Sequence, residues 1–325
     1  MPPVPPGPAT PLPEPRHKIP VLGWVLGIAI FLALAVILQA TVGWRALLDP
    51  WRRMPPGSLV MALLLVLASY AVRTVRIHQY FQPDTGSRFL RTFRLVLLHN
   101  LFNNLFPMRS GEASFPILMK RDFRVPFSRS VPGLVYLRLL DFHFLVMLGA
   151  VVLFARGGQP GWLAVAALAP LPFLAFRAQE RLLVHLRDRK GRVVGFLEKG
   201  LRGLPSTSAL FWTTWLWTGV NWSAKLLAFG WILQIFVPMP YPVALLGSIT
   251  GEISSVLPVH GLAGAGTYEA GILAGLVPLG VKADAALAGA VNLHLFVLGA
   301  SVLGAVVGIL LPVGPRPEEG SREDR

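Results

Sequence analysis

Cysteine is absent from the sequence, and charged residues are scarce at 14% of the chain. The first absence excludes disulfide bonds and thiolate metal ligands. The HExxH, GxSxG and Walker A motifs are also missing, and no soluble stretch is long enough to form a nucleotide-binding domain. We therefore expect neither a metal nor another cofactor, and no ATP-driven transport by this chain alone.

Hydrophobic residues, by contrast, make up 54% of the chain. Their runs are too long and too continuous for a soluble core. The net charge of +14 would suggest nucleic acid as the partner of a soluble chain, but here the basic residues lie between apolar runs, where anionic lipid headgroups are the expected partner. The composition thus predicts an all-α, polytopic helical membrane protein that binds lipid and not nucleic acid.

The pattern divides the chain into a proline-rich, disordered tail (1–18), a single transmembrane domain (19–312) and a charged tail (313–325). Within the domain we predict about six full spans and two broken or re-entrant segments. The full spans are 19–42, 58–75, 132–154, 161–176, 209–236 and 285–311, and the broken segments are 95–118 and 243–279. Arg73 and Arg76, at the end of the second span, are expected to snorkel to the interface.

Basic residues flank the first broken segment on both sides, which predicts that both flanks are cytoplasmic. The segment would then enter and leave on one side as a re-entrant hairpin. The same rule predicts a multi-pass protein of the cell membrane with cytoplasmic N- and C-termini. The flanking residues are Arg73, Arg76, Arg88, Arg91 and Arg94 before the segment, and Lys120, Arg121, Arg124 and Arg129 after it.

The two broken segments resemble each other. Residues 105–109 read Leu-Phe-Pro-Met-Arg and lead to Glu112, and residues 256–260 read Val-Leu-Pro-Val-His and lead to Glu269. This similarity predicts an inverted repeat in which two hairpins enter from opposite membrane faces and meet near the midplane. Transporters place substrate sites at such interrupted helices, because the helix ends offer unpaired N–H and C=O groups.

Two pairs of ionisable residues lie inside these apolar segments, where charge is costly and usually functional. Arg109 and Glu112 are three residues apart, as are Arg138 and Asp141, so each pair shares a face if the backbone is helical. A guanidinium suits a phosphate and a carboxylate suits an amine. The pairs therefore predict a site for a polar headgroup; the alternative is that they only neutralise each other in the packing.

Further candidates carry alternatives of their own. Lys225 lies in the middle of a span and could bind substrate, snorkel, or pair with a carboxylate. Gly264 and Gly266 lack the dinucleotide-binding spacing but could cradle a phosphate or simply permit a tight turn. Glu269 could contact substrate or cap the following helix.

Taken together, residues 19–311 resemble the flippase-like transmembrane domain of lysylphosphatidylglycerol synthases. The positions that carry the resemblance are Asn100, Asn104, Pro107, Arg109, Gly111, Glu112, Arg138, Asp141, Gly264, Gly266 and Glu269. The sequence departs from the pattern at His260 and Ala263, where a more glycine-rich turn is expected.

In that family the membrane domain is implicated in moving lipid across the bilayer. Some members are fused to a cytosolic aminoacyl-transferase domain, and some stand-alone members are linked to polyprenyl-phosphate pathways. The resemblance implies a translocase for a phospholipid or a polyprenyl-phosphate lipid, served by a separate lipid-modifying enzyme because no transferase domain is present in this sequence.

In this hypothesis Arg109 and Arg138 contact a phosphate, while Glu112, Asp141 and Glu269 balance charge or contact an amine. Two alternatives remain at this stage. The chain could be a membrane-embedded transferase with Glu112 or Asp141 as general base, or an accessory membrane subunit without transport activity.

Overall fold

The computed structural model describes residues 32–33, 35–37, 39–154, 159–186, 191–256 and 262–313, apart from the side chains of a few residues within these ranges. Every regular element in these ranges is helical, which confirms the all-α class. The predicted tail 1–18, most of the predicted span 19–42 and nearly all of the tail 313–325 lie outside the described residues.

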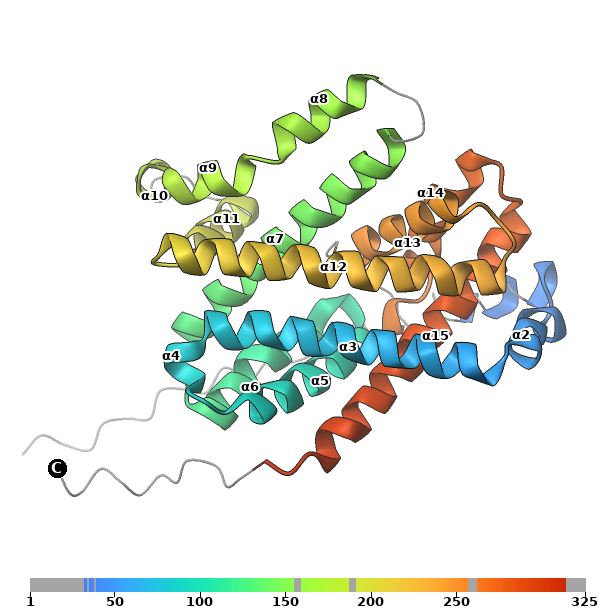
Figure 1. The fold of residues 1–325 in the computed structure, drawn as a ribbon, viewed down its shortest axis with the longest axis horizontal. Helices are drawn as coiled ribbons and strands as arrows, with labels where there is room; N and C mark the ends of the chain where they lie inside the picture. Colours follow the sequence, from blue (N-terminus) through green and yellow to red (C-terminus); the bar gives the residue numbers. More distant parts are fainter. Residues whose placement is uncertain are drawn as a thin grey trace, which may run out of the picture.

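Four long helices build the frame (Figure 1): α3 (Pro56–Tyr80), α7 (Phe127–Phe154), α12 (Ser208–Phe236) and α15 (Ala283–Leu310). Three of them, α3, α7 and α15, are long and apolar enough to cross a membrane. Helices α12 and α13 (Tyr241–Val256), which meet at a bend of 115°, are together long and apolar enough to form a broken span or a re-entrant loop. These helices confirm a polytopic helical membrane protein.

Both predicted broken segments form helical hairpins. The first consists of α5 (Phe89–Leu105), the 3-10 segment η1 (Pro107–Ala113) and α6 (Ser114–Phe123). The second consists of α13, the short turn η2 (Leu262–Gly264), α14 (Thr267–Leu276) and η3 (Val277–Leu279). In each hairpin the two arms pack against each other, and the tips η1 and η2 are in contact. The hairpins therefore meet, as the sequence predicts; their entry from opposite membrane faces stays a prediction.

Glycines let the arms of the second hairpin approach closely. Gly247 and Gly251 on α13, and Gly271 and Gly275 on α14, each lie against residues of the opposite arm. Both arms therefore carry the small-xxx-small spacing of tightly packed membrane helices. A Cβ added to Gly275 would collide with the Thr250 hydroxyl and lie 3.1 Å from Gly247 Cα. The first hairpin uses Gly111 in the same way, since a Cβ there would overlap the backbone of Phe102.

The two halves of the chain make matching contacts. Helices α3 and α12 lie side by side and run in opposite directions (Figure 1), and each packs against the first arm of the hairpin that follows it. The first arm of each hairpin also packs against the second long helix of the other half: α5 packs against α15, and α13 packs against α7. A long helix, a hairpin and a second long helix thus occur twice around one shared centre.

Shorter helices complete the described chain: α2 (Trp44–Arg53), α4 (Gln82–Thr85), α8 (Gln159–Leu168), α9 (Leu171–Arg177), α10 (Gln179–Leu186) and α11 (Arg192–Arg202). The predicted single span 161–176 is therefore wrong in one respect, because it divides into α8 and α9. Pro170 and Pro172 stand at the break, and neither can supply the backbone N–H that a continuous helix needs there.

Candidate functional site

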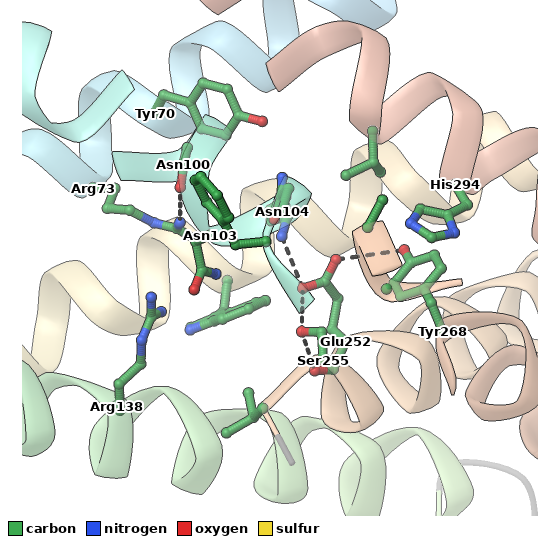
Figure 2. A pocket seen from close by; sticks show the side chains of 17 residues that line it. Tyr70, Arg73, Asn100, Asn103, Asn104, Arg138, Glu252, Ser255, Tyr268 and His294 are labelled. Atoms are coloured by element: carbon green, nitrogen blue, oxygen red, sulfur yellow. Dashed lines mark hydrogen bonds and ion pairs between the residues drawn. The ribbon is translucent and has the colours of Figure 1, made fainter. Parts of the chain in front are cut away.

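A polar pocket lies where the hairpin tips meet α3, α7, α12 and α15 (Figure 2). It encloses about 790 Å³ of empty space, open solvent included. A concave site with converging polar groups inside an apolar bundle is the default position for a ligand. Its ionisable and amide lining includes Arg73, Asn100, Arg138, Lys225, Glu252 and His294.

Arg73 on α3 borders this pocket and is only 8% exposed. Its Nη1 donates a 2.8 Å hydrogen bond to Asn100 Oδ1 on α5, and its guanidinium lies 5.9 Å from the centroid of the Trp222 ring. No carboxylate among the described residues forms an ion pair with it. Arg73 Nε and Asn100 Nδ2 also lack hydrogen-bond partners, so this corner of the pocket has donors and positive charge to offer an anion.

The sequence-based expectation that Arg73 and Arg76 snorkel to the interface is wrong. Helix α3 continues to Tyr80, about two turns beyond Arg73, because the polar residues after position 75 pack against the first hairpin and α7 instead of ending the helix. Both arginines are buried in the protein as a result.

Asp141 on α7 is fully buried and accepts hydrogen bonds from three residues. Arg76 Nη1 lies 2.6 Å from Oδ1, Trp222 Nε1 lies 2.8 Å from the same oxygen, and Arg138 Nη1 lies 3.2 Å from Oδ2. The predicted contact between Arg138 and Asp141 is therefore present. Both carboxylate oxygens are occupied, so this residue neutralises arginines and is poorly placed to accept a substrate proton.

Arg138 joins the two predicted pairs, because its Nε also lies 2.9 Å from Glu112 Oε1 in η1. The guanidinium of Arg138, which borders the pocket, is thus paired with two carboxylates, those of Glu112 in η1 and of Asp141 in α7. Figure 2 shows Arg73 and Arg138 extending from different helices into the same side of the pocket, with Tyr268 and His294 on its other side. The side chain of Arg109 lies outside the described part of the chain.

Lys225 on α12 pairs with Glu252 on α13, with Nζ 2.8 Å from Oε2. Tyr268 of α14 donates to the other oxygen of Glu252 at 3.5 Å. Of the three roles considered from the sequence, pairing with a carboxylate is the one the structure contains. Lys225 nevertheless lines the pocket, so its paired charge still contributes to the electrostatic environment of a ligand.

Glu269 caps the start of α14, because its Oε2 accepts a 2.7 Å hydrogen bond from the Gly266 N–H. Its Oε1 lies 2.6 Å from His294 Nδ1 on α15. Gly264 and Gly266 have φ of 82° and 84°, which glycine adopts at no steric cost; Gly264 also lines the pocket. Ala263 has φ 52°, so the departure noted in the sequence places a side chain where glycine would be favoured.

Asn104 lines the pocket and donates a 2.7 Å hydrogen bond to Ser301 Oγ on α15. Of the residues proposed from sequence, the pocket lining contains Asn100, Asn104, Arg138, Lys225 and Gly264. Four others lie outside the lining and contact the groups described above: Glu112, Asp141, Gly266 and Glu269. The lining also contains residues that the sequence did not identify as a site, namely Tyr70, Arg73, Asn103, Trp222, Tyr268 and His294, together with Glu252, which could equally cap a helix. The available signal was their polarity within apolar runs.

The polar contacts of the two halves correspond. In the first half a cation on the first long helix, Arg73, bonds Asn100 on the hairpin arm 27 residues later. In the second half Lys225 bonds Glu252 across the same sequence separation. A glutamate of each hairpin then pairs with the following long helix, Glu112 with Arg138 in one half and Glu269 with His294 in the other.

Within the described ranges, no group of three or more His, Asp or Glu side chains is placed to hold a metal ion. The model of the family described as "Lysylphosphatidylglycerol synthase TM region" matches residues 24–304. No curated protein matches the sequence significantly. The family match covers most of the chain, and the chain therefore belongs to the lysylphosphatidylglycerol synthase transmembrane family, which associates it with a membrane lipid-related function.

Proposed function

We propose that this protein moves a lipid with an anionic phosphate headgroup between the leaflets of the membrane. The observation that carries the proposal is Arg73, a buried arginine that borders the pocket beside Arg138 and has no carboxylate partner among the described residues.

The physical argument rests on the cost of isolated charge. A guanidinium held in a low-dielectric interior without a counter-ion is unfavourable, and a phosphate supplies both the opposite charge and oxygens that match the planar fork of arginine donors. A phospholipid and a polyprenyl-phosphate lipid share this phosphate. The acyl or prenyl chains would stay in the bilayer while the headgroup enters the pocket.

The meeting of η1 with η2 supports a route across the membrane. The pocket lies at the contact between two hairpins that belong to similar halves of the chain. In transporters built from inverted repeats, one half rocks against the other around such a central site. Separation of the hairpin tips toward one leaflet and then the other would expose the headgroup site alternately.

The transferase alternative has less support with Asp141 as the general base. A general base needs a free oxygen within reach of the proton that it abstracts, whereas Asp141 is fully buried with Arg76, Arg138 and Trp222 on its oxygens. Product formation from a polyprenyl-phosphate carrier in detergent, where no leaflets exist, would favour the transferase.

The test is leaflet exchange in proteoliposomes, measured by quenching of labelled phosphatidylglycerol, lysylphosphatidylglycerol, polyprenyl phosphate and phosphatidylcholine. Arg73→Ala should abolish movement of whichever anionic lipid the native protein moves, and Arg73→Lys should retain part of it. Arg53→Ala, which removes an exposed arginine of α2, is the matched control and should behave as the native protein does. Full movement in folded Arg73→Ala would overturn the proposal.

A further inference from the structure

The second half of the chain carries a glutamate–histidine pair, whose cation can lose its charge, where the first half carries a glutamate–arginine pair, whose cation cannot. Glu112 meets Arg138, whose guanidinium keeps its charge at every physiological pH. Glu269, in the corresponding place, meets His294, whose charge depends on its proton. The charge of the pair in the second half therefore depends on the imidazole.

The other charges around the pocket cancel among the side chains that the structure describes. Among the described side chains that line it, bond to its lining or bond to those partners, the cations are Arg73, Arg76, Arg138 and Lys225, and the carboxylates are Glu112, Asp141, Glu252 and Glu269. Two imidazoles belong to the same set, His294 and His99, whose Nε2 accepts from Arg138 Nη2 at 3.3 Å. With both imidazoles neutral this set has no net charge. With His294 protonated it has one positive charge, which matches the single negative charge of a phosphodiester.

The geometry gives the proton a place to bind. A carboxylate oxygen can only accept, so Nδ1 carries the hydrogen in the 2.6 Å contact with Glu269. Nε2 has no hydrogen-bond partner in the described part of the chain, and 10% of the side chain is exposed where His294 lines the pocket. A proton arriving from the pocket would therefore add at Nε2 and be stabilised through Nδ1 by Glu269.

We propose that the Glu269–His294 pair binds one proton together with one lipid phosphate, so that translocation is coupled to proton movement. The inference rests on the proposed function and names its coupling ion. No bond is made or broken apart from the N–H at Nε2. Uptake of the anion makes the proton more strongly bound, and uptake of the proton makes the anion more strongly bound, because the two charges compensate each other inside a medium that opposes net charge.

Other titratable groups near the pair come from each helix that packs around it. Tyr268 on α14 has its ring 4.8 Å from the imidazole, and Glu252 on α13 is bonded to Tyr268 and to Lys225 of α12. Helix α3 contributes Tyr70, bonded to Ser301 of α15 at 3.5 Å. Helix α5 approaches α15 with an amide, Asn104. The carboxylate of Glu252 is already paired with a lysine, which leaves His294 as the group best placed to take up the proton.

The experiment measures protons taken up per lipid bound. Dihexanoyl-phosphatidylglycerol is titrated into the full-length protein in phosphatidylcholine nanodiscs, by calorimetry in buffers of different ionisation enthalpy. In the pH range where the lipid-bound protein holds this proton and the lipid-free protein does not, the native protein should take up about one proton per lipid, and its affinity should fall about tenfold per pH unit. His294→Arg, which copies the first half, should bind with no proton uptake and little pH dependence.

The outcomes separate the two proposals. Binding that is lost in Arg73→Ala but takes up no proton in the native protein would overturn proton coupling and leave the lipid site intact. The absence of any binding, or binding that Arg73→Ala leaves unchanged, would overturn both. Proton uptake that persists in folded His294→Gln would also overturn the assignment to this pair. The native measurement stands even if every His294 variant misfolds.

Discussion

Arg73 and Asn100 form a 2.8 Å hydrogen bond in the place where the second half of the chain forms an ion pair. An amide accepts from the guanidinium without cancelling its charge, whereas Glu252 cancels the charge of Lys225. The two halves share one contact pattern and differ in this charge, which makes the pocket electrically asymmetric. Asn100 is thus the position at which the anion site can be removed without removing the arginine.

Asn100→Asp should abolish binding and movement of an anionic lipid. Aspartate has nearly the shape of asparagine, so Arg73 keeps its hydrogen bond and gains a counter-ion. We expect unchanged or higher thermal stability together with loss of transport, measured by a melting curve in detergent and by leaflet exchange. Asn104→Asp, on the same helix but bonded to Ser301, serves as the comparison and should retain more activity. Undiminished transport in Asn100→Asp would contradict the phosphate site at Arg73.

Asp141→Asn should destabilise the protein severely. The substitution leaves Arg76 buried at 2% exposure without its counter-ion, and breaking a buried ion pair by removing one partner costs about 3–5 kcal/mol. The measurement is the thermal midpoint in detergent. Asp49→Asn, which breaks an exposed pair with Arg53 on α2, should cost about 1 kcal/mol or less. Equal midpoints for the two variants would contradict a structural role for Asp141.

Gly275→Ala should loosen the second hairpin, whereas Gly299→Ala should not. A Cβ at Gly275 would collide with the Thr250 hydroxyl and approach α13, but a Cβ at Gly299 on α15 meets nothing within 4 Å. Overpacking typically costs about 1–3 kcal/mol, while alanine in a helix is favoured over glycine by about 1 kcal/mol. The thermal midpoint should therefore fall for the first variant and hold or rise for the second. A rise in both would show that the arms of the hairpin are not tightly packed.

The sequence predicts the membrane class and the two hairpins because these depend on local signals. Long apolar runs indicate spans, and the interruptions at Pro107 and Gly264 indicate broken helices. The end of α3 could not be predicted in the same way. Its last turns are polar, and only their contacts with α7 and the first hairpin, which lie far away in the sequence, keep them helical and buried.

The site was partly predictable for the same reason. Arg138 and Asp141 are three residues apart on one helix, so their contact follows from helical geometry. Glu252 and His294 gain their significance only from Lys225 and Glu269, which are distant in sequence. A lone histidine inside an apolar span gives no indication of a carboxylate beside it. The correspondence of the two halves, once the helices are paired, is what identifies these residues.

Labelling of introduced cysteines can test the inverted repeat, and the native sequence contributes no background because it contains no cysteine. Ser87 and Arg124 are exposed on either side of the first hairpin, and Lys282 is exposed directly after the second. If the first hairpin is re-entrant, a membrane-impermeant maleimide should reach Ser87→Cys and Arg124→Cys from the same side of the membrane. If the second hairpin is inverted relative to the first, Lys282→Cys should react only from the other side.

Reaction of all three from one side would exclude the inverted arrangement, and reaction of Ser87→Cys and Arg124→Cys from different sides would make the first hairpin a spanning segment. The same measurement assigns the basic flanks to a compartment, because positions 87 and 124 lie among the arginines from which a cytoplasmic orientation is predicted.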